Sequence, residues 1–453
     1  SGDSIGIRDA REPAKPQFTL KLDAMGDLIR AGSRLYAGGD GQIAAVDLLS
    51  NPEPSTRELK TAWVQKVEGK VERLVAANGM LFAVTLDGKL IAFGKDRVPV
   101  KTHMENAVAP KLLRRGAAQA RAILEQTGAR NGYALVYGAG NGDLLAALAR
   151  LSDLDIVAVE PRAERVAELR RRFDGWGLLG KRVHLLEGTP ATFEAPPYMA
   201  SLIVLAEGGD GWENNESLKK MVRSVRPYGG KIWLPSGAAR PAFLARLRAG
   251  ADGRARAAKS LASGAVLSKD GPLPSAGNWT HQYGNVANTV KSDDGLVKLP
   301  LGVLWFGGVS NIDVLPRHGH GPPEQIVDGR LIIEGIDSIS ARDVYTGRAL
   351  WKTPLDKSDT FDQYYDDSHQ DLPLKVITNQ GHIPGANARG TNFVATSDWV
   401  YVLQGSRCQA LDTTTGKVKK VFSLPAEDGA EPARWGYIGV SRDRLIAGRD
   451  FVP

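Results

Sequence analysis

Short, largely apolar runs of residues typical of β-strands dominate the first hundred residues. Two sets of three such runs are separated by Gly, Asp or Asn: 28–30, 34–39 and 41–47, then 73–77, 79–84 and 88–94. Short β-type runs joined by turn residues are typical of antiparallel meanders. The pattern therefore predicts short antiparallel strands over residues 17–100.

The pattern changes in the middle of the chain. Residues 105–270 are rich in Ala, Leu and Arg, and helical periods alternate there with short apolar runs. Alternation of this kind is typical of βαβ units, in which helices cover the faces of a parallel sheet. We expect an α/β domain here.

Short strands return from about residue 275. Two of them end in the same turn pattern, D-x-x-T-G-(K/R), at 343–348 and 412–417. β units that recur every 40–50 residues are typical of propeller blades. An unrelated β-sandwich is the alternative interpretation.

Charge and cysteine content exclude several classes. Lys and Arg total 58 and Asp and Glu total 51, a net charge of +7 over 453 residues. That charge is too dilute to indicate a nucleic-acid partner. The single cysteine, Cys408, excludes a disulfide within the chain and a cysteine-based metal cluster. No apolar run reaches 18 residues, so we expect no membrane-spanning helix.

The β segments resemble the quinoprotein-like (PQQ-repeat) β-propeller family over about 1–100 and 275–453. The resemblance depends on the two D-x-x-T-G-(K/R) turns and on the W-x8-N-T run at 279–289. The family includes pyrroloquinoline-quinone alcohol dehydrogenases and non-enzymatic outer-membrane assembly lipoproteins. The dehydrogenases have a vicinal disulfide, which a chain with one cysteine cannot form. Quinone-dependent oxidation is therefore the least favoured function.

The clearest chemical motif lies in the middle domain. An apolar run at 133–137 leads into GAGNGD at 138–143 and then into a helical pattern. A second apolar run ends at Glu160, 22 residues after Gly138. Glycines let the backbone approach a ligand, and a helix N-terminus offers free N–H donors. A carboxylate at the end of the second strand is suited to ribose hydroxyls.

Two cofactor classes compete for this site, a dinucleotide and S-adenosylmethionine. Dinucleotide sites have G-x-G-x-x-G, whereas position 143 is Asp here. The G-x-G-x-G spacing and the later run RPYGGKIWL at 226–234 resemble the class I S-adenosylmethionine-dependent methyltransferases. This resemblance covers about 109–270 and implies a Rossmann-like domain that binds S-adenosylmethionine. The cofactor-binding residues it implies are Gly138, Gly140, Gly142, Asp143, Glu160, Pro161 and Thr189.

Catalytic residues are harder to predict. The methyl group of the sulfonium is already activated, so positioning of the acceptor supplies most of the rate. Glu207 and Asp210 follow the expected fourth strand and are candidates for contact with an acceptor. Thr189 stands where the family usually has an acidic residue that contacts the adenine, which leaves that contact in question.

Histidines and arginines provide weaker signals. His318, His320 and His382 lie in loop-like runs and are candidate metal ligands, but their spacing is not diagnostic. Isolated histidines bonded to backbone are the favoured interpretation, so no metal is predicted. The five arginines in 162–172 predict a solvated helix face rather than a site for an anionic partner.

Together these patterns predict a multidomain β + α/β protein. A methyltransferase-like domain at 104–270 interrupts a propeller formed by 1–103 and 271–453, whose last blade is truncated. The residues outside the insertion are too few for eight blades, so we expect another chain or segment to complete the ring.

The favoured function is S-adenosylmethionine-dependent methyl transfer to an unknown acceptor, with the propeller recruiting the substrate or a protein partner. The alternative is a non-enzymatic scaffold with a degenerate methyltransferase domain. The propeller resemblance and the absence of an initial methionine favour a bacterial periplasm or envelope over the cytoplasm.

Overall fold

A computed structural model describes residues 4–9, 12–48, 60–96, 101–102, 107–206, 211–212, 214–250, 255–261, 264–306, 324–335, 338–355, 392–426 and 432–449. The chain divides into two compact units, Ser1–Met104 and Glu105–Pro453. Each unit is described by itself.

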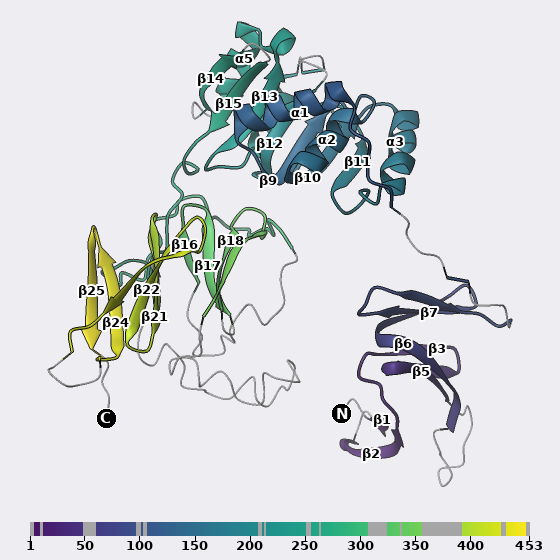
Figure 1. Ribbon diagram of the computed structural model, residues 1–453. Helices are drawn as coiled ribbons and strands as arrows, with labels where there is room; N and C mark the ends of the chain where they lie inside the picture. Colours follow the sequence, from purple (N-terminus) through teal and green to yellow (C-terminus); the bar gives the residue numbers. More distant parts are fainter. Residues whose placement is uncertain are drawn as a thin grey trace. The chain divides into compact units, whose positions relative to one another are not determined.

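The first unit consists of antiparallel strands (Figure 1). A hairpin and a six-stranded sheet contain β1 (Ser4–Asp9), β2 (Glu12–Lys21), β3 (Asp27–Ala31), β4 (Arg34–Gly38), β5 (Asp40–Asp47), β6 (Lys60–Ala77), β7 (Met80–Thr85) and β8 (Leu90–Phe93). The two predicted sets of runs belong to one sheet, because the 18-residue strand β6 pairs with both β5 and β7. Gly69 lies within β6 with φ of 95°, a conformation that favours glycine and lets the strand bend.

The second unit begins with an α/β domain. Its elements are α1 (Arg114–Thr127), β9 (Asn131–Tyr137), α2 (Asp143–Leu151), β10 (Asp153–Glu160), α3 (Ala163–Gly175), β11 (Val183–Glu187), β12 (Ala200–Leu205), α4 (Asn215–Ser224), β13 (Gly230–Pro235), α5 (Pro241–Gly250), β14 (Ala255–Leu261) and β15 (Gly264–Lys269). They form a seven-stranded sheet in the order β11-β10-β9-β12-β13-β15-β14. Strands β9 to β13 pair in parallel, and β15 is antiparallel to both of its neighbours.

Both faces of this sheet are buried, which explains the continuous apolar runs in the sequence. In β9, Ala134 and Val136 pack with α1, α2 and α3, whereas Leu135 and Tyr137 pack with α4 and α5 on the other face. The structure is thus the doubly wound, Rossmann-like domain that the pattern predicts. Among the helices that the structure describes, none is both long enough and apolar enough to cross a membrane.

The remaining strands form antiparallel sheets. Two four-stranded meanders and a hairpin contain β16 (Gln325–Val327), β17 (Arg330–Gly335), β18 (Ser338–Asp343), β19 (Ala349–Pro354), β20 (Phe393–Ala395), β21 (Trp399–Gln404), β22 (Arg407–Asp412), β23 (Val418–Ser423), β24 (Trp435–Ser441) and β25 (Arg444–Arg449). The two meanders share one apolar core, to which Ile332, Ile339, Phe393 and Val400 belong. Each meander has the strand arrangement expected of a blade, and their place in a propeller stays a prediction.

The repeated D-x-x-T-G pattern has a structural cause. Trp351 of β19 donates a hydrogen bond from Nε1 to the carbonyl of Thr413 (2.9 Å), and its ring lies against Gly416. Trp305 makes the same bond to the carbonyl of Val344 (2.9 Å) and lies against Gly347. Both glycines have positive φ, and a Cβ at either position would collide with the indole ring. The motif therefore marks a turn on which a tryptophan packs.

Candidate functional site

The strand order reverses at the carboxyl end of β9. This strand lies between β10 and β12, and all three run parallel. In open α/β sheets, ligands bind outside the carboxyl ends of the strands at such a reversal. The predicted cofactor-binding residues follow β9, β10 and β11, so the fold brings them to one edge of the sheet.

The glycine loop after β9 has three left-handed positions, Gly138 (φ 89°), Gly140 (φ 54°) and Gly142 (φ 82°). The N–H of Gly138 donates to the carbonyl of Val159 at 2.9 Å, which holds the loop against β10. A Cβ added to Gly140 would meet nothing within 4 Å in the part of the chain that the structure describes. Backbone at Gly140 is therefore open to a ligand.

Gly142 has a packing role that the resemblance does not imply. A Cβ on Gly142 would lie 2.8 Å from Cδ2 of Leu169 and 3.1 Å from Cε2 of Phe173, both in α3. The absence of a side chain here lets α2 start directly against α3. Gly142 thus serves helix packing, and its part in cofactor binding stays a prediction.

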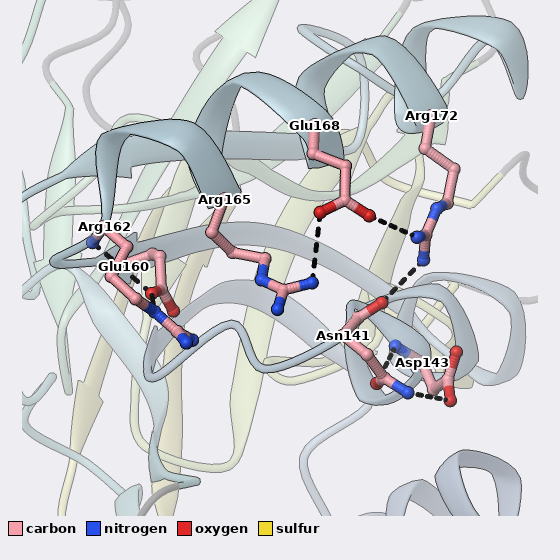
Figure 2. Close-up of polar contacts among 7 residues, drawn as sticks. All are labelled: Asn141, Asp143, Glu160, Arg162, Arg165, Glu168 and Arg172. Atoms are coloured by element: carbon pink, nitrogen blue, oxygen red, sulfur yellow. Dashed lines mark hydrogen bonds and ion pairs between the residues drawn. The ribbon is translucent and has the colours of Figure 1, made fainter.

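Glu160 is the buried acidic group of this edge. Its side chain is 0% exposed, and Oε2 accepts a hydrogen bond from the N–H of Ala139 at 3.2 Å. Oε1 accepts from Nε of Arg162 at 2.7 Å (Figure 2). A buried carboxylate needs such donors, because burial without them costs several kcal/mol. The Arg162 side chain is 55% exposed, so one partner of Glu160 borders solvent.

Helix α3 is tied to the glycine loop by an ion network (Figure 2). Glu168 accepts from Arg165 at 3.1 Å and from Arg172 at 2.9 Å. Arg172 also donates to the carbonyl of Asn141 at 2.6 Å, and Asn141 donates to Asp143 at 2.6 Å. These arginines bind within the domain rather than forming the simple solvated face that the sequence predicts. The sequence could have indicated these ion pairs. Arg165 lies three residues before Glu168 and Arg172 lies four residues after it, and side chains at these spacings meet on a helix.

The other predicted cofactor-binding residues differ in exposure and in the hydrogen bonds that they already make within the protein. Asp143 is the first residue of α2, and Pro161 is exposed beside Arg162. Thr189 follows β11, and its hydroxyl accepts from the N–H of Ala191 at 3.3 Å within its own turn. The catalytic candidates Glu207 and Asp210 lie outside the described residues.

Sequence reasoning missed an aromatic cluster on the other face of the sheet. Tyr137 ends β9 and contacts Trp212 edge to face, with ring centroids 4.8 Å apart. Its ring also meets Phe193 at 6.3 Å. Burial raises the pKa of the Tyr137 hydroxyl, so this group is neutral and not a general base. The sequence could have indicated this cluster, because Tyr137 is an aromatic residue at the end of an apolar, buried strand.

Among the described histidines, His281 has a structural role. His281 is buried, its Nε2 accepts from the N–H of Val440 at 3.0 Å, and burial lowers its pKa. It is therefore a neutral acceptor that joins two segments. His318, His320 and His382 lie outside the described residues. Among the residues that are described, no three His, Cys, Asp or Glu side chains are grouped to hold a metal ion.

No protein-family model and no curated protein matches this chain. Solved structures do match it, at low identity. A protein of Methanococcus maripaludis, provisionally assigned as an S-adenosyl-L-methionine-dependent methyltransferase, is 17% identical, with a TM-score of 0.30 over 35% of this chain and 86% of that chain. A SAM-dependent methyltransferase from Aquifex aeolicus is 16% identical, with a TM-score of 0.28 over 33% of this chain and 89% of that chain.

A third match is a SAM-dependent methyltransferase from Thiobacillus denitrificans in complex with S-adenosyl-L-homocysteine. It is 18% identical, with a TM-score of 0.23, over 28% of this chain and half of that chain (50%). At these identities and TM-scores, the matches assign no function to this chain.

Proposed function

We propose that the α/β domain binds S-adenosylmethionine at the carboxyl edge of β9 and β10 and catalyses transfer of its methyl group to an acceptor. The observation behind the proposal is the position of Glu160. Its buried carboxylate lies beside the glycine loop at the point where the strand order reverses. A carboxylate in this position suits the two ribose hydroxyls of a nucleoside.

The residues at this edge fit such a ligand. Open space at Gly140 lets a ligand approach the backbone closely. The ribose hydroxyls would replace Nε of Arg162 as donors to Glu160, and the half-exposed Arg162 has room to turn into solvent. The Arg172 contact to Asn141 would hold the loop in place while the ligand binds.

The sheet topology and the RPYGG run at 226–230 both support the class I methyltransferase fold. Strands β9 to β13 give the order β11-β10-β9-β12-β13, and the reversed β15 lies between β13 and β14. This is the strand arrangement of the class I methyltransferase fold. The bound cofactor would supply an activated methyl group, and the protein would bind it, orient it and exclude water. Glu207 and Asp210 follow β12, so they stay candidates for contact with the acceptor.

A second candidate function is a non-enzymatic scaffold. Two predicted cofactor contacts are already satisfied within the protein: Glu160 is paired with Arg162, and the hydroxyl of Thr189 is used in its own turn. These bonds are what a domain that had lost its ligand would make. Measured cofactor binding separates the two functions.

Calorimetric titration of the full chain with S-adenosylmethionine and S-adenosylhomocysteine tests the proposal. We expect both to bind, and Glu160→Gln to weaken binding by about 10- to 100-fold, because a charged hydrogen bond contributes about 1.5–3 kcal/mol. Glu187→Gln is the matched control. Glu187 ends β11 directly opposite Glu160 in register, but its side chain is exposed. No binding by the unaltered chain would favour the scaffold.

A further inference from the structure

The α/β domain contacts the β16–β19 sheet through a buried ion pair. Nε of Arg226 lies 2.5 Å from Oδ2 of Asp343, and the two side chains are 15% and 3% exposed. Arg226 also donates to the carbonyls of Pro227 (3.0 Å) and Tyr228 (3.3 Å), so its guanidinium is fixed on its own loop. Removing one partner of such a pair leaves an uncompensated buried charge.

Two further contacts join the same turn to the α/β domain. The rings of Tyr198 and Tyr345 lie 5.6 Å apart, and Nη2 of Arg348 donates to Oδ1 of Asn131 at 3.2 Å. Asp343, Tyr345 and Arg348 all belong to residues 343–348, which we call the Asp343 turn. This one turn therefore provides a carboxylate, an aromatic ring and a guanidinium to the α/β domain.

The second copy of the motif, residues 412–417, is called the Asp412 turn. Its hydrogen bonds differ from those of the Asp343 turn. There Oδ1 of Asp412 accepts from the hydroxyls of Thr414 (2.6 Å) and Thr415 (3.0 Å). Tyr345 stands at the position of Thr414. The tyrosine offers no such hydroxyl to Oδ1 of Asp343, and its ring meets Tyr198. The other carboxylate oxygen, Oδ2, accepts from Arg226.

The contact lies at the amino-terminal edge of the parallel sheet. Asn131 begins β9, Tyr198 precedes β12, and Arg226 precedes β13. The glycine loop follows β9, and Glu160 is the last residue of β10, so both lie at the carboxyl ends of these strands. The contact with the Asp343 turn and the proposed cofactor site therefore lie at opposite ends of the parallel strands.

We propose that the Asp343 turn is the anchoring site for the α/β domain, specialised from the repeated turn by the tyrosine at 345, and that it holds the domain by the edge opposite its ligand site. The β16–β19 sheet thus fixes the domain without covering the carboxyl edge, and an acceptor reaches that edge without displacing the sheet. The anchoring itself does not depend on cofactor binding.

Hydrogen–deuterium exchange on the full chain tests the anchor. We expect Asp343→Asn and Arg226→Met each to speed exchange at both 226–230 and 343–348 by at least about tenfold. The double variant should exchange no faster than the faster single variant, because the two groups act as a pair. Asp412→Asn, the matched control, should change exchange at 412–417 and leave 226–230 unchanged.

A second variant, which leaves both charged residues in place, distinguishes loss of the anchor from general unfolding. Tyr345→Thr keeps the Arg226–Asp343 pair, offers Oδ1 of Asp343 a hydroxyl as in the Asp412 turn, and removes the ring that meets Tyr198. The Asp343 turn should therefore keep its protection, while the backbone around Tyr198 exchanges faster. Affinity for S-adenosylhomocysteine should stay within about twofold, because the ligand site is on the other edge. Unchanged exchange at 226–230 in Asp343→Asn, or fully additive effects in the double variant, would overturn the anchor. Absence of cofactor binding would contradict the proposed function and leave these exchange results valid.

Discussion

At the scale of single residues, identical side chains acquire different properties from their surroundings. Asp343 and Asp412 occupy the same place in two copies of one turn. Hydrogen bonds from Thr414 and Thr415 lower the pKa of Asp412 to about 2, and this residue borders solvent. The side chain of Asp343 is 3% exposed and pairs with Arg226. The motif alone therefore identifies the turn but not which copy binds another domain.

Cys408 should be unreactive in the folded protein. It is fully buried in β22, and burial raises the pKa of its thiol to about 12. The thiolate is the reactive form and is almost absent at pH 8. We expect a disulfide-exchange reagent such as Ellman's reagent to detect no thiol in the native chain and one thiol per chain in denaturant. Rapid reaction of the native protein would contradict the burial of Cys408.

Glu334 should make stability depend on pH. Burial raises the pKa of this carboxyl to about 8, an effect that a hydrogen bond from Asn392 partly opposes. The folded protein then retains a proton that the unfolded chain releases near pH 4.5, so stability falls as pH rises from about 4.5 to about 8.

Glu334→Gln should remove this slope. We expect it to raise the free energy of unfolding at pH 8 by on the order of 4 kcal/mol and to change little at pH 4. Denaturant unfolding at several pH values measures the effect. Glu125→Gln, at an exposed position of α1, is the control and should leave the slope intact. A loss of stability in Glu334→Gln at pH 8 would show that the carboxylate is needed in its charged form.

At the scale of elements, the glycines of one loop have separable roles. Gly142→Ala places a methyl group 2.8 Å from Leu169 at a left-handed position, so we expect it to destabilise the α/β domain by about 2–3 kcal/mol. Gly140→Ala meets open space and should cost about 1 kcal/mol, while weakening cofactor binding by about tenfold. Denaturant unfolding and calorimetric titration of both variants distinguish packing from ligand approach.

The contact between the two meanders should depend on one glycine. A Cβ at Gly416 would collide with the ring of Trp351, which joins β19 to the neighbouring sheet. We expect Gly416→Ala to lower stability by about 2–4 kcal/mol and to shift Trp351 fluorescence. Gly405→Ala, at a left-handed turn position with open space around it, is the control and should have a smaller effect.

At the scale of the whole molecule, the two units should respond differently to a ligand. Residues 1–104 and 105–453 form separate compact units, and the proposed cofactor site lies in the second. S-adenosylhomocysteine at 100 times its dissociation constant should stabilise the second unit by about 2.7 kcal/mol. Scanning calorimetry should show one transition that rises with ligand and one that does not move. A uniform shift of all transitions would indicate that the units unfold together.

The sequence predicted more of the α/β domain than of the β segments. Glycines at 138, 140 and 142 followed by Glu160 predicted a strand, turn, helix and strand, because local spacing determines that unit. In the first unit, the two predicted sets of strands are joined by β6, which runs through both. Strand pairing is non-local, so periodicity could locate the strands but not their partners.

Local sequence by itself determined the strand, loop and helix order of the α/β domain, its parallel strands buried on both faces, and the repeated turns with their glycines. Tertiary structure decided which groups are used by the protein itself: Arg162 pairs with Glu160, Arg172 holds the glycine loop, and Arg226 pairs with Asp343. The physical reason is distance along the chain. Helix and strand periods act within a few residues, whereas the Arg226–Asp343 pair joins residues 117 positions apart and forms only when the fold brings them together.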